Sequence, residues 1–152
     1  MRILGIDPGT STGFVVLDTT ILYAGTIKKD AQPDPDWAKT CSDHALRLVE
    51  EFSPDRVGLE LFVPPHVYYQ GKKQLIHPAT IVTPAIVFGG VFCALETHGI
   101  HTYIVYPKHN GSGANYPKEL QGRKPKGLGP STGTRQHERS AYDIAWKTGL
   151  MP

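Results

Sequence analysis

The chain has 152 residues, of which 39% are hydrophobic, and its formal net charge is +2. This length suits one domain with a hydrophobic core and is too short for two ordinary ones, so we expect a single domain over residues 1–152. No apolar run looks long enough to cross a bilayer, and the first residues lack a basic and then apolar leader. Both observations favour a cytoplasmic protein without a membrane partner.

The positions of the cysteines and of the basic side chains indicate which metal or partner the chain can bind. Cys41 and Cys93 have no partner at metal-ligand spacing, so we predict both as small core residues. Residues 107–136 contain six basic side chains against Glu119 alone, which gives this stretch a net +5 and the remainder −3. A basic segment on a slightly acidic body suits a polyanionic partner, while a solvated loop has the same composition.

The first half of the chain predicts three strands and a helix. The strands are expected near residues 2–7, 12–18 and 20–28, and their tight spacing requires antiparallel neighbours. A helix is then expected to about Phe52, because apolar residues recur at three- and four-residue steps and Asp34 or Asp36 can cap its start.

The second half alternates strands with helices. We expect a buried strand in "DRVGLELF", a helix over about Thr83–Thr97, a strand near residues 101–106, a long irregular basic loop at about 107–134 and a last helix ending at Gly149. Strands joined by a helix generally run parallel. The sequence therefore predicts an α/β fold whose mixed five-stranded sheet has three antiparallel strands followed by two parallel ones, flanked by helices.

Two carboxylates follow predicted strands directly. Asp7 precedes Pro8-Gly9, and Glu60 ends "VGLE". If their strands are parallel neighbours, both side chains emerge at the same sheet edge, where open α/β sheets bind ligands. Two anions a few ångströms apart are tolerated when a divalent cation lies between them. A helix packed over that edge would complete a magnesium site, and Asp143 is the candidate.

Such a site is suited to phosphodiester hydrolysis, in which two ions about 4 Å apart activate water and stabilise the leaving oxygen. Gly9 would let the backbone approach a ligand, and Thr10, Ser11 and Thr12 offer hydroxyls for a phosphate. Simpler explanations exist for two of the acids. Asp7 can form a turn before Pro-Gly, and Asp143 can be an exposed helix residue.

The motifs "GIDPGTSTG", "VGLE" and "HERSAYDIA" occur in an order that resembles the RuvC family of Holliday junction resolvases, in particular its shorter phage-type relatives. The resemblance implies a ribonuclease H-like fold and a homodimer that resolves four-way DNA junctions by paired symmetric nicks, in a bacterial cell or a phage-infected host. It also implies Mg²⁺ or Mn²⁺ as cofactor, with Asp7 and Glu60 as the first two ligands.

The last motif departs from the family pattern, in which an acid or histidine is followed three residues on by aspartate and alanine. Here His137 is followed by Ser140, and the next three-residue step reaches Asp143. We favour Asp143 as a catalytic metal ligand. His137 is a second candidate that ranks behind it, because the six positions between the two residues do not make a whole number of helical turns. Glu138 is a reserve.

Aromatic and basic residues alternate after Glu60. Tyr68 and Tyr69 with Lys72 and Lys73 are expected to bind DNA, since bases stack on aromatic rings while lysines meet phosphates. In RuvC-like proteins this region reaches the junction centre, although the tyrosines can equally pack against the body or a partner subunit. In the later loop, three further side chains are expected to contact the phosphate backbone: Arg123, Lys124 and Lys126.

Three other functions compete with the resolvase. The first motif also resembles the phosphate-binding turn of the actin, heat-shock-protein and sugar-kinase superfamily, but those proteins need two lobes and this chain has room for one. An RNA-processing nuclease of the YqgF type would share the fold. A catalytically inactive module that binds branched DNA is suggested by Ser140, which stands where an aspartate is expected.

Overall fold

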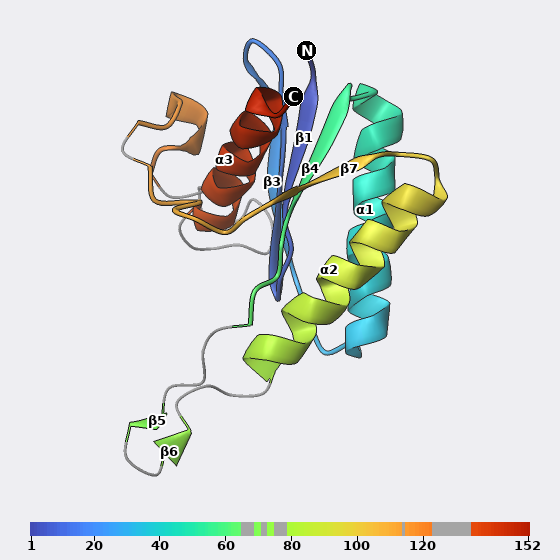
Figure 1. Cartoon of the computed structure of the whole chain (residues 1–152), viewed down its shortest axis with the longest axis vertical. Helices are drawn as coiled ribbons and strands as arrows, with labels where there is room; N and C mark the ends of the chain where they lie inside the picture. The colour runs from blue at the N-terminus through green and yellow to red at the C-terminus, as the bar shows by residue number, and fades with distance from the viewer. Residues whose placement is uncertain (65–68, 71–72, 75–78, 114, 123–134) are drawn as a thin grey trace.

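The computed structural model describes residues 1–64, 69–70, 73–74, 79–113, 115–122 and 135–152. Within these residues, the chain forms a five-stranded sheet flanked by helices (Figure 1). Its strands are β1 (Ile3–Asp7), β2 (Ser11–Leu17), β3 (Ile21–Lys28), β4 (Arg56–Glu60) and β7 (Thr102–Val105). The helices are α1 (Asp34–Phe52), α2 (Ala79–Thr97) and α3 (Gln136–Leu150), with a short 3₁₀ helix η1 (Lys118–Leu120).

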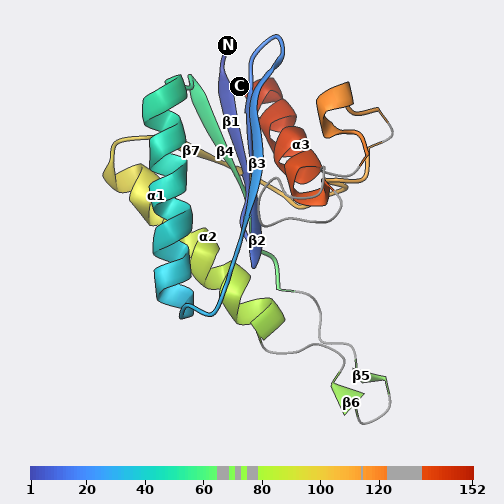
Figure 2. The ribbon, with the colours of Figure 1, turned by 180° about the vertical axis from the view of Figure 1, so that it is seen from behind.

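The strand order is β3-β2-β1-β4-β7. The pairs β1·β2 and β2·β3 are antiparallel, whereas β4 pairs parallel with both β1 and β7. Helices α1 and α2 lie on one face of this sheet and α3 lies on the other (Figure 2). The predicted mixed sheet, with three antiparallel strands followed by two parallel ones, is confirmed.

The main core lies between the sheet and α1/α2. Because successive strand residues point to opposite faces, Leu4 and Ile6 of β1 face this core, where they join Trp37 and Leu48 of α1. Ile3 and Val15 instead belong to a smaller cluster with Ala141 and Ala145 of α3. The one-sided apolar pattern predicted for α1 is therefore confirmed, and α3 buries its small apolar residues against the other face of the sheet.

Two strand glycines allow α3 to lie directly on the sheet. A Cβ atom added at Gly5 would be 2.1 Å from the carbonyl oxygen of Ala141, and one at Gly13 would be 2.1 Å from that of His137. Real Cβ atoms never approach a backbone oxygen so closely. The helix backbone thus occupies the space that side chains on β1 and β2 would fill, and the first turn of α3 is held beside the end of β1.

Several element boundaries differ from the predictions. Asp34 is the first residue of α1 and Pro33 stands at its cap position without a side-chain bond, so neither Asp34 nor Asp36 caps the helix. Helix α2 begins at Ala79 rather than near Thr83, with Pro84 inside it. Proline lacks the N–H of the helical hydrogen bond, and the prediction therefore placed the start too late. Helix α3 ends one residue beyond Gly149.

Helix α2 corrects two further expectations. Its window Thr80–Thr97 has a mean hydropathy of 1.6, so by length and composition it is long and apolar enough to cross a membrane, contrary to the prediction. A core helix of a soluble protein can meet the same criterion. Only 22% of that window is buried. Helix α2 buries Val87, Val91 and Leu95 against the body, while Cys93 is exposed and is not the core residue expected from sequence.

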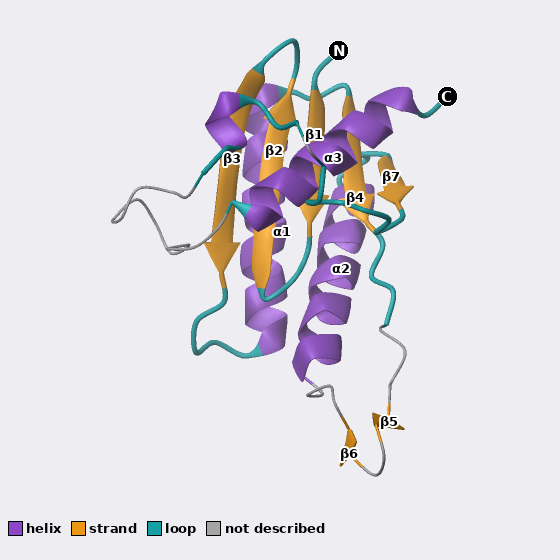
Figure 3. Cartoon of the chain, turned by 90° about the vertical axis from the view of Figure 1, so that its left-hand side faces the viewer, coloured by secondary structure: helices purple, strands orange, loops and turns teal. Residues whose placement is uncertain are grey.

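A small second sheet and the 3₁₀ helix were not predicted. Strands β5 (Tyr69–Gln70) and β6 (Lys73–Gln74) pair antiparallel and lie at the end of the molecule opposite the two termini (Figure 3). Helix η1 lies within the stretch expected to be an irregular loop, and its Leu120 is fully buried. The described part of that loop is therefore packed against the body.

Candidate active site

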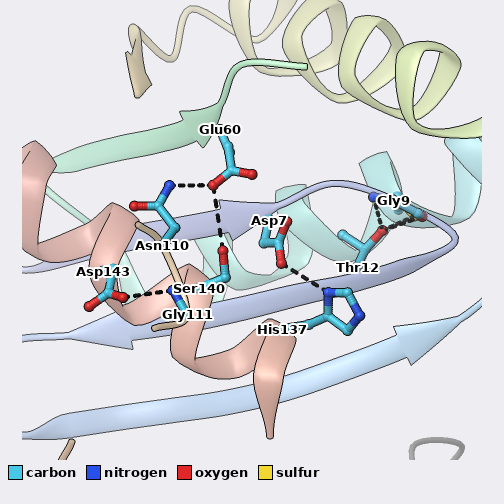
Figure 4. A network of polar contacts seen from close by, with 10 residues as sticks. Asp7, Gly9, Thr12, Glu60, Asn110, Gly111, His137, Ser140 and Asp143 are labelled. Carbon is cyan, nitrogen blue, oxygen red and sulfur yellow. Dashed lines mark hydrogen bonds and ion pairs between the residues drawn. The ribbon is translucent and has the colours of Figure 1, made fainter. Parts of the chain in front are cut away.

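Asp7 and His137 form an ion pair at the carboxyl end of β1. The Oδ2 atom of Asp7 lies 2.9 Å from Nδ1 of His137. The Asp7 side chain is 13% exposed and the imidazole is 39% exposed. Because His137 belongs to the first turn of α3, the close packing of that helix on the sheet brings the two groups together (Figure 4).

Glu60 emerges from the end of β4, the parallel neighbour of β1. Its Oε2 atom accepts a hydrogen bond from Nδ2 of Asn110, and the Ser140 hydroxyl lies 3.5 Å from the same oxygen. Ser140 also lowers the pKa of Asp7, and the negative charge of Asp7 raises that of Glu60. The two carboxylates predicted to share a sheet edge are thus close enough to interact, with Ser140 between them.

The electrostatics of these groups indicate a site under charge repulsion. Burial raises the pKa of Asp7, and the hydrogen bond and charge of His137 only partly offset it. Burial and then the charge of Asp7 raise the pKa of Glu60. The hydrogen bond to Asp7 raises the pKa of His137, against the effect of burial. A cation placed here would relieve the cost of keeping two carboxylates ionised side by side.

Asp143 lies two three-residue steps beyond His137 and takes part in different contacts. Its Oδ2 atom accepts hydrogen bonds from the backbone N–H of Gly111, at 2.8 Å, and from the hydroxyl of Tyr116, at 2.6 Å. In Figure 4 its carboxylate faces Gly111, while Ser140 and His137 face Glu60 and Asp7. Its predicted role as a metal ligand stays a prediction. The two helix positions whose side chains contact the carboxylates are His137, at Asp7, and Ser140, at Glu60.

The reserve residue Glu138 and the first-motif hydroxyls have other positions than expected. Glu138 is fully buried and pairs with Arg135 at 3.2 Å. Thr12 is also buried, and its hydroxyl donates to the Gly9 carbonyl at 3.0 Å and accepts from the Gly9 N–H at 3.2 Å. The expectation that Thr12 offers its hydroxyl to a phosphate is therefore wrong, because that hydroxyl closes the turn after β1. Thr10 and Ser11 line a surface cleft instead.

That cleft borders the carboxylate site. It has a volume of about 410 Å³ and is lined by Pro8–Ser11, Thr80, Pro84 and His137. The imidazole of His137 therefore has Asp7 at one nitrogen and belongs to the cleft wall. A ligand in the cleft would approach the sheet edge beside the turn that follows β1.

The donor set suits a hard divalent cation, although it is not assembled as a finished metal site. Among the residues that the structure describes, no three His, Cys, Asp or Glu side chains are already grouped to hold a metal ion. Asp7 is paired with His137, and Glu60 with Asn110. Carboxylate oxygens are the ligands that Mg²⁺ and Mn²⁺ prefer, and two of them repel each other here. The chemistry of the residues therefore fits such an ion.

The predicted DNA-binding residues lie outside what the structure describes. This holds for Tyr68, Lys72, Arg123, Lys124 and Lys126 in full, and for the side chains of Tyr69 and Lys73, whose backbones belong to β5 and β6. Their roles stay predictions.

Sequence reasoning missed three residues that surround the site: Asn110, Tyr116 and Lys147. The first two belong to the stretch predicted as an irregular loop. A weak signal was available in α3, where Arg139, Asp143 and Lys147 recur every four residues. That spacing places charged side chains on one helix face.

Comparisons with known proteins were made for the sequence and for the fold. No family model matches the chain. The crossover junction endodeoxyribonuclease RuvC of Ralstonia nicotianae is 45% identical over 67 residues, which is 40% of this chain and 37% of that protein. The enzyme of the same name from Methylococcus capsulatus is 36% identical over 64 residues, 39% of each chain. The matches thus span less than two fifths of these curated relatives.

The fold comparison extends over nearly the whole chain. The structure of Thermus thermophilus RuvC in complex with a Holliday junction substrate superposes with a TM-score of 0.62 at 17% identity, covering 95% of this chain and 90% of that one. Another structure of Thermus thermophilus RuvC gives a TM-score of 0.61 at 19% identity, with 95% and 91% covered. The sequence matches thus cover about two fifths of this chain, and its overall fold is similar to that of Thermus thermophilus RuvC.

Proposed function

We propose that the protein is a metal-dependent endonuclease that cleaves branched DNA and resolves Holliday junctions by paired nicks. One observation carries the proposal: Asp7, Glu60 and His137, from three distant parts of the chain, converge at one sheet edge. Burial raises the pKa of both acids there, and the charge of Asp7 raises that of Glu60 further. The RuvC relatives carry the name of this activity. The protein would act in the cytoplasm of a bacterial cell or a phage-infected host.

In this mechanism Asp7, Glu60 and His137 would hold Mg²⁺ or Mn²⁺. The bound ion would activate water and stabilise the leaving oxygen of the phosphodiester. Asp7 and Glu60 contribute the negative charge that binds it, and His137 must give up the proton that its pairing with Asp7 favours. Asp143 stays a prediction as a further ligand, because its Oδ2 atom already accepts two hydrogen bonds.

DNA would reach the site along the cleft beside His137. Thr10 and Ser11 line this cleft and could meet a backbone phosphate, as the sequence suggested. Two further sets of predicted contacts would increase the affinity for branched DNA. These are the phosphate contacts of Arg123, Lys124 and Lys126 and the base stacking of Tyr68 and Tyr69. Removing each phosphate contact should reduce the slope of log affinity against log salt by about 0.9.

A homodimer would supply the two active sites that paired nicks require. A two-fold symmetric dimer presents the same surface from both copies. Helix α2 is the candidate surface, because most of its apolar window is not buried in the single chain. We propose that its exposed positions contact a second copy rather than a membrane.

The test is a nicking assay on a synthetic four-way junction with Mg²⁺ or Mn²⁺, comparing the unmodified protein with Asp7→Asn and Glu60→Gln. Symmetric nicks that disappear in both variants support the proposal. Because each variant keeps the size of the side chain, junction binding in Ca²⁺ should remain. Cleavage that survives in Asp7→Asn, or that occurs without a divalent ion, overturns it.

A second candidate function is a branched-DNA-binding module without catalysis. Ser140 lies against Glu60 where the family pattern has an acid, so the site has a neutral hydroxyl in that position. In this case the unmodified protein would bind the junction and leave it uncut. Ser140→Asp would then be expected to create nicking activity, whereas in a competent nuclease it changes an existing rate.

A further inference from the structure

The segment that follows β7 folds back over the carboxylate site. We call residues 107–113 and 115–122 the post-β7 segment. It begins beside Glu60, because Val105 is the register partner of Glu60 and its carbonyl accepts a hydrogen bond from the Leu61 N–H at 2.8 Å. The chain then reverses at His109 and Gly111, which have positive φ angles of 60° and 79°. Asn110 lies between these two.

This reversal of the chain is costly to form, and it places the side chain of Asn110 beside Glu60. A non-glycine residue with positive φ is uncommon, and such residues cluster at functional sites. Here the Ser112 hydroxyl donates to the His109 carbonyl at 2.9 Å, which holds the turn. The result is that Nδ2 of Asn110 donates to Oε2 of Glu60.

The orientation of the Asn110 amide is fixed by a cation. Lys147 of α3 donates from Nζ to Oδ1 of Asn110 and, at 2.6 Å, to the carbonyl of Lys108. An ammonium can only donate, so it selects the amide orientation whose oxygen faces Lys147 and whose NH₂ faces Glu60. The charge of Lys147 also lowers the pKa of Glu60. Lys147 thus acts on Glu60 through Asn110 and through its charge.

One face of α3 holds the rest of the segment. Arg139 donates from Nε to the Leu120 carbonyl at 2.7 Å and stacks over the ring of Tyr116 at 5.6 Å. Asp143 accepts from Gly111 and Tyr116. With Lys147, these residues are spaced by four along the helix and contact the segment at both ends of its described part.

We infer that Asn110 is a positioning residue that orients the Glu60 carboxylate toward the divalent cation, with Lys147 fixing the Asn110 amide. The inference rests on the proposed metal-dependent function. Asn110 and Ser140 both contact Oε2 of Glu60, which leaves Oε1 as the oxygen for the ion. The structural reason for the strained turn is then to deliver an uncharged donor, because a second cation at this point would compete with the metal.

The experiment measures Mn²⁺ binding to the DNA-free protein by titration calorimetry, together with the nicking rate and junction affinity. Groups that orient metal ligands typically contribute 10- to 100-fold to metal affinity or activity. We therefore expect Asn110→Ala to raise the Mn²⁺ Kd by about 10-fold or more. The nicking rate at saturating junction should fall, while junction affinity measured in Ca²⁺ stays within twofold. Asn115→Ala is the matched control, an exposed asparagine of the same segment, and should leave the Mn²⁺ Kd unchanged.

Two further variants make the outcome decisive. Asn110→Leu keeps the size of the side chain but can neither donate to Glu60 nor accept from Lys147, and it adds no charge, so it provides the test if Asn110→Ala unfolds. Lys147→Met should weaken Mn²⁺ binding, and its effect should be clearly smaller in the Asn110→Ala background than in the unmodified protein, because the part that acts through Asn110 is already lost there.

The results separate this inference from the proposed function. Mn²⁺ affinity within twofold of the unmodified protein in both Asn110 variants, or fully additive effects of Asn110 and Lys147, overturns the positioning role. Unmodified protein that binds Mn²⁺ without nicking overturns the nuclease, and the Asn110 variants still decide the inference through binding. Unmodified protein that binds no Mn²⁺ overturns both.

Discussion

Asp7 and His137 are separated by 130 residues in the sequence, and their side chains meet at 2.9 Å. The contact depends on two backbones, since β1 carries the carboxylate and α3 lies on the sheet closely enough for its first turn to present the imidazole. Burial nevertheless raises the pKa of Asp7 above that of an aspartate in water, against the effect of His137. Several measurable consequences follow from these features.

The carboxylate site should lower the stability of the metal-free protein. Because burial raises the pKa of Asp7 and the charge of Asp7 raises that of Glu60, Asp7→Asn removes an unfavourable charge. At pH 8 in EDTA we expect a gain of about 1 kcal/mol, or about 2–4 °C in Tm for a chain of this size. Added Mn²⁺ should raise the Tm of the unmodified protein more than that of the variant. Differential scanning calorimetry measures both, and a variant that melts lower in EDTA contradicts the prediction.

The metal-free protein should also lose stability as pH rises above neutrality. The folded-state pKa of His137 is raised above 6.5, so folded protein holds its proton where unfolded protein releases it. Its contribution is therefore complete below pH 6.5 and is lost as pH rises through the folded pKa. The raised pKa values of Asp7 and Glu60 change stability in the same direction. As pH rises above 3.8 and 4.5, respectively, folded protein keeps protons that unfolded protein has already released. Denaturation in EDTA from pH 6.5 to 8.5 should show the decline.

The control for this pH effect is His137→Gln, in which the decline in stability should be smaller. His44 affects stability in the opposite direction, because burial lowers its pKa to about 4. Its contribution to stability therefore increases between pH 4 and 6.5 and is complete above that window. An unchanged slope in His137→Gln between pH 6.5 and 8.5 would show that other groups cause the decline.

The close packing of α3 on the sheet should not tolerate a side chain at Gly5. An added Cβ would meet the Ala141 carbonyl at 2.1 Å and the Ala145 nitrogen at 2.7 Å. Gly5→Ala must shift the helix, and we expect a loss of about 1–3 kcal/mol together with loss of nicking. Gly89→Ala is the control, because no atom lies within 4 Å of its Cβ position inside α2. It should stabilise by about 0.5–1 kcal/mol. Urea denaturation compares them.

Asp143 can be tested as a ligand and as a holder of the post-β7 segment. Asp143→Asn keeps an acceptor for Gly111 and Tyr116. Tyr116→Phe instead removes the hydrogen bonds of the hydroxyl to Asp143 and Gly113 and leaves the carboxylate charge. From the contacts we expect both variants to nick more slowly by similar modest factors, about 10-fold or less. Abolished nicking in Asp143→Asn beside near-normal nicking in Tyr116→Phe would establish Asp143 as a ligand.

The two thiols should differ in reactivity. Burial raises the pKa of Cys41 to about 11, while Cys93 is exposed on α2. A maleimide should therefore label one site in the folded protein and two after denaturation. Mass spectrometry locates the label, and Cys93→Ser should abolish the native reaction. If α2 forms the dimer surface, labelling should also slow as protein concentration increases.

The sheet and the first two site residues could be predicted because their signals are local. Apolar runs of strand length, interrupted by Pro8-Gly9 and similar turns, defined the strands, and a carboxylate at the end of each of two parallel strands must emerge at one edge. The start of α2 could not be predicted in this way, because Pro84 is locally a helix-breaking signal. Its position is instead maintained by packing against α1.

The surroundings of the site depend on contacts between distant segments. Asn110 belongs to a stretch rich in Gly, Ser and Asn, and only its contacts with α3 and Glu60 distinguish it from an ordinary turn residue. The recurrence of Arg139, Asp143 and Lys147 was visible, but an exposed helix face has the same spacing of charges. The preference for Asp143 over His137 came from counting helical steps without knowing which face the glycines of β1 and β2 draw onto the sheet.

Helix α3 makes two sets of contacts at once. One side places His137 and Ser140 beside the carboxylates, and another side binds the post-β7 segment. Insertion or deletion of one residue between Arg139 and Lys147 would rotate everything beyond it by about 100°. A change in the length of this helix would therefore keep both sets of contacts only if it fell in the last turn. Natural variation in the segment it holds should be compensated by exchanges at positions 139, 143 and 147.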